Sequence, residues 1–509
     1  MNLIKSTGTF SFYTILSRIL GYIRDLLIAI NLGSGPITDA FFVAFRIPNT
    51  FRRLFSEGTF NAAFVPSYSS ELVKSKKKAD EFSNNVLNFL IISLLGITLI
   101  IELFMPLFVN LIAPGFSENN EKFLLTTYLT RITFPFLFFI SLASFFSAIL
   151  NSHNKFGVAA AAPIILNIIL ILILIFLKFE NDLIVIYLSY GISLAGLIQL
   201  IVLMFFVKKF YLPKIDFKIK ITKKIKIFFK KLVPSIFSSG VTQINILVGT
   251  IIASFEVNAV SYLYYADRIY QINLAIAGIA IGTVLLPNLS KHVQSGNKKK
   301  INFIQSKSVE LSLFLSLPAM FALLIASEEI TSSLFGYGSF NENSVKNSAK
   351  ALYYFAFGLP AFALIKIFSS FLFARQNTKI PFYFSLVSVV VNIIISVSFF
   401  KDFGFIIIPI STTISSWINA LLLFFYLQDK NYFKLNLDII FKLLRIFCAV
   451  ILSSYFFYLM TDYYSQRLIY ESNYKLIYVL LLVIITLFLY VLISIFTKAF
   501  KLSDIKLKY

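Results

Sequence analysis

The stretch that decides the fold is Thr38–Pro66, TDAFFVAFRIPNTFRRLFSEGTFNAAFVP. It is long and apolar enough to cross a bilayer, because a spanning helix needs about 20 mostly apolar residues. The stretch nevertheless carries five charged residues: Asp39, Arg46, Arg52, Arg53 and Glu57. A central charge costs about 2.5–3.5 kcal/mol on an insertion scale, so this face cannot meet lipid. The sequence therefore predicts a membrane helix whose charged face lines a hydrated cavity walled by protein.

The preceding apolar segment, near 10–31, carries Arg18, Arg24 and Asp25. Eight such groups in two spans would cost about 20–28 kcal/mol if all of them faced lipid. Five are arginines and three are carboxylates, so pairing leaves surplus positive charge and predicts an anionic ligand. Arginine suits phosphate because the guanidinium donates two parallel hydrogen bonds and keeps its charge when desolvated. The alternative is that these charges form internal salt bridges that only orient the helices.

Helical spacing arranges these charges. Asp39, Arg46, Arg53 and Glu57 follow one another at seven, seven and four residues, which places them on one stripe unless Pro48 rotates the two halves of the helix. Arg18 and Asp25 also share a face. The second half of the chain repeats the pattern more sparsely, with Asp267, Arg268 and Lys366 inside apolar segments. We also expect a turn at Gly33–Pro36, and kinks at Pro48 and Pro135.

The composition of the whole chain agrees with a membrane protein. Of 509 residues, 58% are hydrophobic and 14% are charged, whereas soluble chains carry roughly 25% charged residues. This excludes a water-soluble enzyme and predicts an all-α protein with many spans. The net charge of +22 indicates basic cytoplasmic loops rather than nucleic-acid binding. With Cys448 as the single cysteine and no phosphate-binding GxxxxGK run, we predict no disulfide, metal site, cofactor or ATP site, and no enzymatic activity.

Apolar segments separated by Gly, Pro, Asn and charge clusters predict fourteen spans. Lysines gather in the connections after even-numbered spans, at 74–78, 208–226 and 298–300, and in the tail at 498–508. Because positive charge accumulates on the cytoplasmic side, both termini are expected in the cytoplasm. The segment 214–231, KIDFKIKITKKIKIFFKK, is either an interfacial segment on the anionic inner leaflet or a solvated basic linker. The spans are expected near 10–31, 37–66, 86–113, 123–151, 157–177, 183–207, 232–255, 259–290, 308–335, 348–374, 380–400, 404–427, 440–461 and 475–497.

The chain also resembles itself. Pro135 and Asn167 recur as Pro360 and Asn392, each displaced by 225 residues. We therefore expect two six-helix lobes related by a pseudo-twofold axis along the membrane normal, an arrangement found in transporters. The lobes are 1–213 and 232–430, joined by 214–231, and residues 431–509 add two helices and a basic tail. The alternative is a coincidental match of Pro and Asn in low-complexity apolar sequence.

Five stretches carry a resemblance to a known family. They are SRILGYIRDLLIA (Ser17–Ala29), the Thr38–Pro66 stretch, YYADRIYQ (Tyr264–Gln271), GTVLLPNLSK (Gly282–Lys291) and ARQNTK (Ala374–Lys379). Together they closely resemble the MurJ (MviN) lipid II flippase family, a branch of the multidrug/oligosaccharidyl-lipid/polysaccharide exporter superfamily. The resemblance covers essentially the whole chain.

The resemblance implies a function and a set of site residues. Members move undecaprenyl-pyrophosphate-linked peptidoglycan precursor from the inner to the outer leaflet of the bacterial cytoplasmic membrane by alternating access. The positions that match the family's functional arginines are Arg18, Arg24, Arg52 and Arg268, and Asp25 and Asp39 match their acidic partners. We give Arg53, Glu57 and Asp267 a supporting or gating role beside those two acids. The appended helices are expected to form a groove for the lipid tail.

Two departures from the family are visible. Gln271 stands where some relatives carry a glutamate, so a proton or cation role is not expected there. Some relatives bind sodium between spans seven, eleven and twelve, but those spans offer no carboxylate well inside them here. Their polar residues are Gln243, Asn245, Asn392, Thr412 and Thr413.

Three rival functions compete with this interpretation. A flippase for another polyprenyl-pyrophosphate oligosaccharide would share the anion-binding residues. A cation-coupled drug exporter would need a cavity rich in carboxylates, which the arginines of the first two spans oppose. A scaffold would use buried ion pairs for assembly alone. The preferred interpretation takes lipid II and membrane lipids as partners of a monomeric protein that works with cell-wall synthesis proteins.

Overall fold

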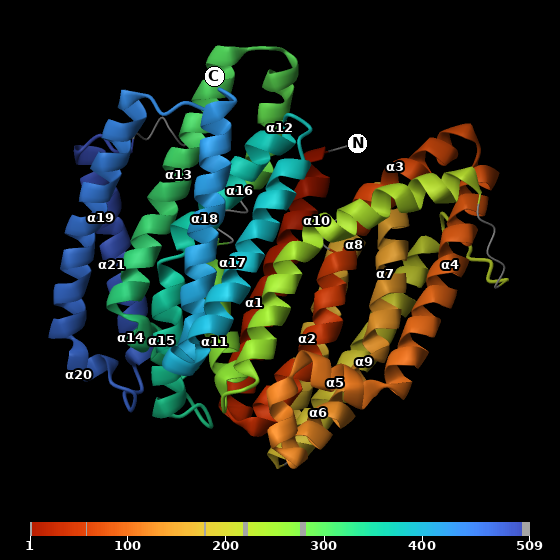
Figure 1. The fold of residues 1–509 in the computed structure, drawn as a ribbon, viewed down its shortest axis with the longest axis horizontal. Helices are drawn as coiled ribbons and strands as arrows, with labels where there is room; N and C mark the ends of the chain where they lie inside the picture. Colours follow the sequence, from red (N-terminus) through yellow and green to blue (C-terminus); the bar gives the residue numbers. More distant parts are fainter. Residues whose placement is uncertain (1–2, 57–58, 178–179, 217–221, 275–280, 501–509) are drawn as a thin grey trace. The chain divides into compact units, whose positions relative to one another are not determined.

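The computed structural model describes residues 3–56, 59–177, 180–216, 222–274 and 281–500. Within these ranges the regular structure is helical, as the composition predicted (Figure 1). Packing divides the chain into two compact units, Met1–Ser261 and Tyr262–Tyr509. The first unit reaches beyond the predicted lobe of residues 1–213, because it also contains the helix of the seventh predicted span.

The first unit is a bundle of long helices joined by short turns. The turn at Gly33–Pro36 lies where the sequence predicted it, with Gly33 at a positive φ of 63°. The bounds are α1 (Leu3–Leu32), α2 (Pro36–Ser56), α3 (Thr59–Lys74), α4 (Lys76–Leu103), α5 (Met105–Ile112), η1 (Pro114–Glu118), α6 (Asn120–Thr133), α7 (Pro135–Ser152), α8 (Phe156–Phe176), α9 (Asn181–Val207) and α10 (Lys223–Ala253).

The second unit contains the remaining helices. The pair α17 and α18 forms an antiparallel hairpin, since Ser388 bonds to the carbonyl of Ser415 and Asn392 to Thr412. The bounds are α11 (Ala259–Leu274), α12 (Ile281–Gln294), α13 (Lys298–Ile325), α14 (Ser327–Phe335), α15 (Glu342–Ala356), α16 (Leu359–Phe373), α17 (Lys379–Phe403), η3 (Gly404–Ile406), α18 (Ile407–Asp429), α19 (Leu437–Tyr463), α20 (Ser465–Leu468) and α21 (Lys475–Phe496).

Several helices begin at a side chain that caps them. Asn119 accepts a hydrogen bond from the backbone N–H of Lys122 at 3.0 Å, and Ser75 and Asn297 do the same for Lys78 and Lys300. Such caps satisfy one of the backbone donors that a helix start leaves unpaired. The cap at Asn119 also fixes Lys122 in the first turn of α6, which matters for the site described below.

Eight segments of the described chain are long and apolar enough to cross a membrane, or nine if the pair α15 and α16, bent by 44°, is one span. One of the eight, Lys379–Asp429, is the α17–α18 hairpin and therefore holds two crossings. The predicted fourth span contains α6 and α7, which meet at Phe134 just before Pro135. The predicted second span contains α2 and α3, and residues 57–58 between them lie outside the described residues.

The basic segment 214–231 is in part helical. Asp216 accepts a hydrogen bond from Asn88 of α4 at 2.7 Å, and α10 begins at Lys223. Ile225 and Phe228 are buried, and Lys224 pairs with Glu71 of α3. The start of α10 is thus an amphipathic helix packed on α3, which excludes the interpretation of the entire segment as a solvated linker.

Two of the prolines inside helices, Pro48 in α2 and Pro318 in α13, each leave a carbonyl without its usual partner, and a neighbouring helix supplies the missing donor. Pro48 has no N–H for the carbonyl of Ala44, one turn earlier in α2. The hydroxyl of Thr133 donates to that carbonyl at 2.9 Å. Pro318 likewise has no N–H to donate to the carbonyl of Phe314 in α13. The hydroxyl of Tyr490 donates to that carbonyl at 2.9 Å. Polar side chains of neighbouring helices therefore satisfy both unpaired carbonyls, as the absence of water in a bilayer requires.

This pairing generates a stability prediction. Thr133→Val should destabilise the protein by about 1–3 kcal/mol, because the buried Ala44 carbonyl loses its donor. The control is Thr126→Val: Thr126 is equally buried, but its hydroxyl bonds only within α6, to the carbonyl of Lys122. Denaturant titration in detergent measures both variants, and equal losses would show that the Ala44 carbonyl does not depend on Thr133.

Candidate functional site

Arg24 is the centre of a buried polar cluster between α1 and α8. Its guanidinium pairs with Asp25, Nη2 to Oδ1 at 2.7 Å, and its Nη1 donates to Oδ1 of Asn167 at 2.9 Å. Asn167 in turn donates to the carbonyl of Ser17 at 2.9 Å. Arg24 is 6% exposed and Asp25 3% exposed. The cluster holds the guanidinium in one orientation, and it pairs Asp25 with its sequence neighbour rather than with Arg18.

Asp39 has a different partner from the one expected. Its Oδ2 accepts from Nζ of Lys122 in α6 at 2.8 Å, and its Oδ1 accepts from both the backbone N–H and the hydroxyl of Ser261, at 2.9 and 2.8 Å. Asp39 is fully buried, and the Lys122 ammonium lies 3.8 Å from the centre of the Phe116 ring. The prediction that Asp39 holds an arginine is therefore wrong, because a buried lysine neutralises it.

Lys122 is the residue that sequence reasoning missed. It follows a helix cap and two acidic or amide residues, a pattern typical of an exposed first turn of a helix. Only the packing of α6 on α2 shows that its stem is buried and its ammonium reaches Asp39. Because Asp39 is occupied by Lys122, the five arginines of α1 and α2 are left with fewer carboxylates than the sequence suggested.

The three arginines of α2 are partly buried, and spacing places Arg46 and Arg53 on one side of the helix and Arg52 on another. Arg46 donates to the hydroxyl of Thr250 in α10, and Arg52 Nε donates to Asn49 at 2.9 Å. Arg52 and Arg53 are half-buried, and Nε of Arg53 is buried without a hydrogen-bond partner among the described residues. Glu57 lies outside the described residues. Asp39 bonds to Ser261 and Arg46 bonds to Thr250. These two members of the predicted stripe therefore face the same segment of the chain, 250–261.

Arg18 differs from Arg24 although both belong to α1. It is exposed, and the structure gives it no ion pair with another described residue. Arg24 is held in one orientation by its neighbours, whereas Arg18 is exposed, so the two arginines of α1 differ in their surroundings.

In the second unit, Asp267 and Arg268 lie side by side on α11. Arg268 Nη2 donates to the hydroxyl of Tyr264 at 2.8 Å, and its guanidinium carbon lies 4.6 Å from the centre of that ring. Asp267 accepts from Gln271, so Gln271 serves as a donor where a glutamate would repel the acid. Both charged residues are half-buried, and Lys366 on α16 is exposed.

Two of the polar residues considered for a cation, Asn392 and Thr412, bond to each other, whereas Thr413 donates to the carbonyl of Tyr354. Asn392 bonds to Thr412 at 3.0 Å and accepts from Ser396 at 3.1 Å, and Ser411 joins the same cluster. Across the described residues, no three His, Cys, Asp or Glu side chains gather as metal ligands. The α17–α18 cluster thus works as a hydrogen-bonded link between two helices.

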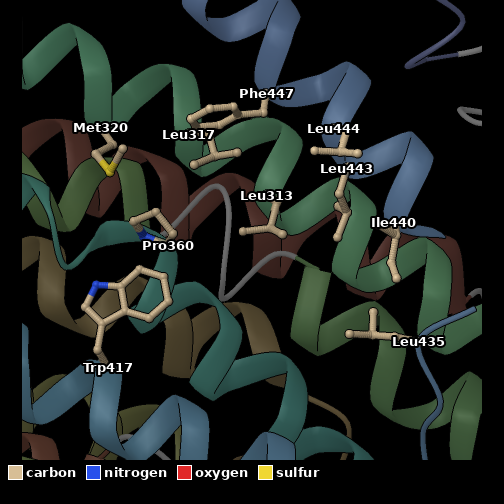
Figure 2. A pocket seen from close by; sticks show the side chains of 10 residues that line it. All are labelled: Leu313, Leu317, Met320, Pro360, Trp417, Leu435, Ile440, Leu443, Leu444 and Phe447. Atoms are coloured by element: carbon tan, nitrogen blue, oxygen red, sulfur yellow. The ribbon is translucent and has the colours of Figure 1, made fainter. Parts of the chain in front are cut away.

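The second unit also contains an apolar groove of about 350 Å³. Figure 2 shows Met320, Pro360 and Trp417 at one end and Leu435 with Ile440 at the other. The side chains between them come from α13 and α19: Leu313, Leu317, Leu443, Leu444 and Phe447. No charged side chain lines this groove, so it suits a hydrocarbon chain.

The buried pair in the first unit gives a prediction. Asp39→Asn should destabilise the protein by about 3–5 kcal/mol, because it leaves Lys122 as an uncompensated buried charge while the introduced amide oxygen still accepts from Ser261. Adding Lys122→Met should recover most of that loss. Denaturant titration provides the free energies, and exposed Glu121→Gln on the same turn is the control. A double variant no more stable than Asp39→Asn would refute the pairing.

Comparison with known proteins places the chain among relatives. A family model described as "Lipid II flippase MurJ" matches residues 28–480. A "Probable lipid II flippase MurJ" of Rhizobium meliloti is 39% identical over 469 residues, covering 91% of this chain and 88% of that protein. The corresponding protein of Rickettsia prowazekii is 37% identical over 456 residues, covering 89% of this chain and 88% of its own length.

Solved structures give the same result at the level of the fold. The structure "Lipid II flippase MurJ, inward closed conformation" matches with a TM-score of 0.83 at 28% identity, covering 96% of this chain and 98% of that one. An inward-facing multidrug resistance MATE family transporter of the MOP superfamily matches with a TM-score of 0.66, covering 81% of this chain and 94% of that one. At 14% identity, the second likeness concerns the fold alone.

Proposed function

The chain belongs to the lipid II flippase MurJ family, and from that premise we propose that it is a lipid II flippase. It is a transporter and not an enzyme, and it resides in the bacterial inner membrane. It moves undecaprenyl-pyrophosphate-linked peptidoglycan precursor from the inner to the outer leaflet for cell-wall synthesis. The mechanism is alternating access, in which a central site opens to one side of the membrane at a time.

The observation that supports this function best is the charge of α1 and α2. Five arginines occupy these helices against two carboxylates, Asp25 and Asp39, and Asp39 pairs with Lys122. A pyrophosphate brings the negative charge that such a site needs, and the guanidinium matches its oxygens with paired hydrogen bonds. The same surplus of positive charge opposes a site for cationic drugs. Arg18, Arg24, Arg52 and Arg268 are the proposed ligands of the pyrophosphate.

Arg24 and Asp25 supply an exchange of partners. In the absence of substrate, Asp25 neutralises Arg24 at 2.7 Å and Asn167 fixes its remaining nitrogen. An arriving pyrophosphate competes with Asp25 for the guanidinium, while Asn167 keeps Arg24 from leaving the site. Asp25 therefore has a gating role, and Asp39 keeps α2 in place through Lys122. Arg53, Glu57 and Asp267 are proposed to support the site.

The proposed architecture has fourteen spans in two six-helix lobes with two appended helices and both termini in the cytoplasm. The repeat is supported by position: Pro135 opens α7 and Pro360 opens α16, while Asn167 and Asn392 are buried in α8 and α17. The predicted lobes, 1–213 and 232–430, are defined by the repeat in the sequence. The two compact units are defined by packing, so their boundary at Ser261 differs from that of the lobes. The empty, positively charged carrier is reset by the membrane potential, which contributes about 2.3 kcal/mol per charge per 100 mV.

The apolar groove is the proposed site of the undecaprenyl tail. Its walls, α13 and α19, contribute Leu, Ile and Phe side chains, and the groove contains no charge to repel hydrocarbon. Lipid II then uses two kinds of surface, cationic for the diphosphate and apolar for the tail. The proposal further takes the protein as a monomer that works with cell-wall synthesis proteins.

The role of Arg24 can be tested in cells. Arg24→Ala should abolish outward exposure of lipid II. Arg24→Lys should retain a small part of it, because lysine keeps the charge but cannot donate two parallel hydrogen bonds to the pyrophosphate. Lipid II that is open to cleavage by an enzyme added outside the cell measures the exposure. The control, Lys346→Ala, removes a half-exposed surface lysine of α15. Normal exposure with Arg24→Ala would refute the proposal.

The rival functions give different results. If the charges serve assembly alone, the exchange Arg24→Asp with Asp25→Arg keeps the buried pair and should preserve transport; as a ligand site, it should not. If the substrate is another polyprenyl-pyrophosphate oligosaccharide, purified protein should bind that glycolipid more tightly than lipid II. We expect loss of transport in the first experiment and preference for lipid II in the second.

A further inference from the structure

The apolar groove is lined by α13 and α19, which pack on each other, and by Pro360 of α16 and Trp417 of α18, so its width depends on the position and tilt of α19 (Figure 2). α19 packs against α21, its antiparallel neighbour, and both belong to the segment that follows the predicted six-helix lobe (Figure 1). α19 already packs on α13 through Ile446 and Val450 against Phe314, and attachments at the two ends fix the tilt of the pair. The structure shows such attachments at both ends of the pair.

At one end, the attachment is an ion-pair cluster on α13. Glu310 is 8% exposed, and its Oε2 accepts from Nζ of Lys442 in α19 at 2.7 Å and from Nζ of Lys307 at 3.0 Å. One turn further along α13, Tyr490 of α21 donates to the Phe314 carbonyl that Pro318 leaves unpaired. These contacts tie the beginning of α19 and the end of α21 to α13.

At the other end, the attachment is Lys475, the first residue of α21, which is 2% exposed. Its Nζ donates to the carbonyls of Gly336 and Tyr470, both at 2.7 Å. The rings of Tyr337 and Tyr470 lie 4.6 and 4.4 Å from the ammonium. Tyr470 also donates to the carbonyl of Phe340 at 3.1 Å. The ammonium therefore joins the connection before α21 to the connection between α14 and α15.

The carbonyls of Gly336 and Tyr470 and the rings of Tyr337 and Tyr470 form a cage around this ammonium, and the cage depends on the turn at Gly336. A Cβ at Gly336 would lie 2.6 Å from the carbonyl oxygen of Ser332, so glycine allows the turn that places its own carbonyl on Lys475. A buried ammonium is tolerated only where strong acceptors surround it, so movement of either connection would leave the charge uncompensated. From Lys442 to the end of α19 at Tyr463 is about 32 Å of helix. The two attachments are thus separated by a length of helix close to the thickness of a hydrocarbon core, which is about 30 Å.

We propose that Lys475 is a positioning residue for transport: its caged ammonium fixes the α19–α21 pair to the α14–α15 connection and so keeps the groove at the width that a long isoprenoid chain requires. The inference rests on the proposed function of the groove as the site of the lipid tail. Lys475 acts through α19 and does not touch the substrate.

The first test measures the attachment without any transport. Spin labels at Lys350→Cys on α15 and Ser465→Cys on α20, in a Cys448→Ser background, report the distance between the two parts in lipid nanodiscs. We expect one narrow distance distribution with Lys475 and with Lys475→Arg, which keeps the charge. With Lys475→Met, which keeps most of the aliphatic stem, the distribution should broaden. An unchanged distribution with Lys475→Met would overturn the proposal.

The second test separates positioning from general damage. In proteoliposomes, Lys475→Met should reduce transport of a pyrophosphate lipid with the full undecaprenyl chain roughly tenfold, and of the same headgroup on a short farnesyl chain less than about twofold. Lys475→Arg should restore the undecaprenyl rate in part, and the matched surface control Lys346→Met should change neither rate. Equal losses for both chains would overturn the positioning role. If the unaltered protein moves neither lipid, the proposed function fails, and the spin-label distances still decide whether Lys475 anchors the pair.

Discussion

The constraint that governs this structure is the cost of an ionised side chain inside a bilayer. Such a group must find an opposite charge, a set of dipoles or water. Two of these solutions are seen in the following residues. Asp39 pairs with Lys122, and Arg24 pairs with Asp25 and donates a hydrogen bond to Asn167. The ammonium of Lys475 is surrounded by two carbonyls and two aromatic rings. Arg18 takes the remaining solution and stays exposed. Asp39 and Lys122 hold two helices together, whereas Arg24 is paired in this structure and is also a proposed ligand of the pyrophosphate.

The same requirement applies to the backbone. A proline inside a membrane helix leaves a carbonyl without a donor, and no water is available to replace it. At Ala44 and at Phe314 the missing donor is a hydroxyl from another helix, Thr133 or Tyr490. Each proline thus specifies a neighbour as well as a bend. In α13 the neighbour is α21. The carbonyl that Pro318 leaves unpaired thus attaches α21, and with it the α19–α21 pair, to α13.

The proposed substrate class rests on two surfaces with opposite character. Arginines of α1 and α2 are the proposed partners of the diphosphate, and the uncharged groove lined by α13 and α19 is the proposed site of the long hydrocarbon. A soluble anion would need only the first surface, and a hydrophobic drug only the second. The combination explains why membership of a lipid-linked oligosaccharide flippase family is chemically reasonable for this chain, independently of the sequence match.

The sequence by itself determined the class of protein and its helices, and it contains the cationic residues on which the proposed site for anions rests. Hydropathy and the charges of Thr38–Pro66 are properties of local segments, so they can be read without knowing the packing. What only the tertiary structure decided was the partner of each charge. Asp39 could not be assigned to Lys122, 83 residues away, because pairing depends on which helix faces pack. The sequence marked Asn167 only as part of the internal repeat, and the packing of α8 on α1 makes it a partner of Arg24. The groove and the cage of Lys475 likewise join segments far apart in the chain, since buried contacts arise between helix faces and not along the sequence.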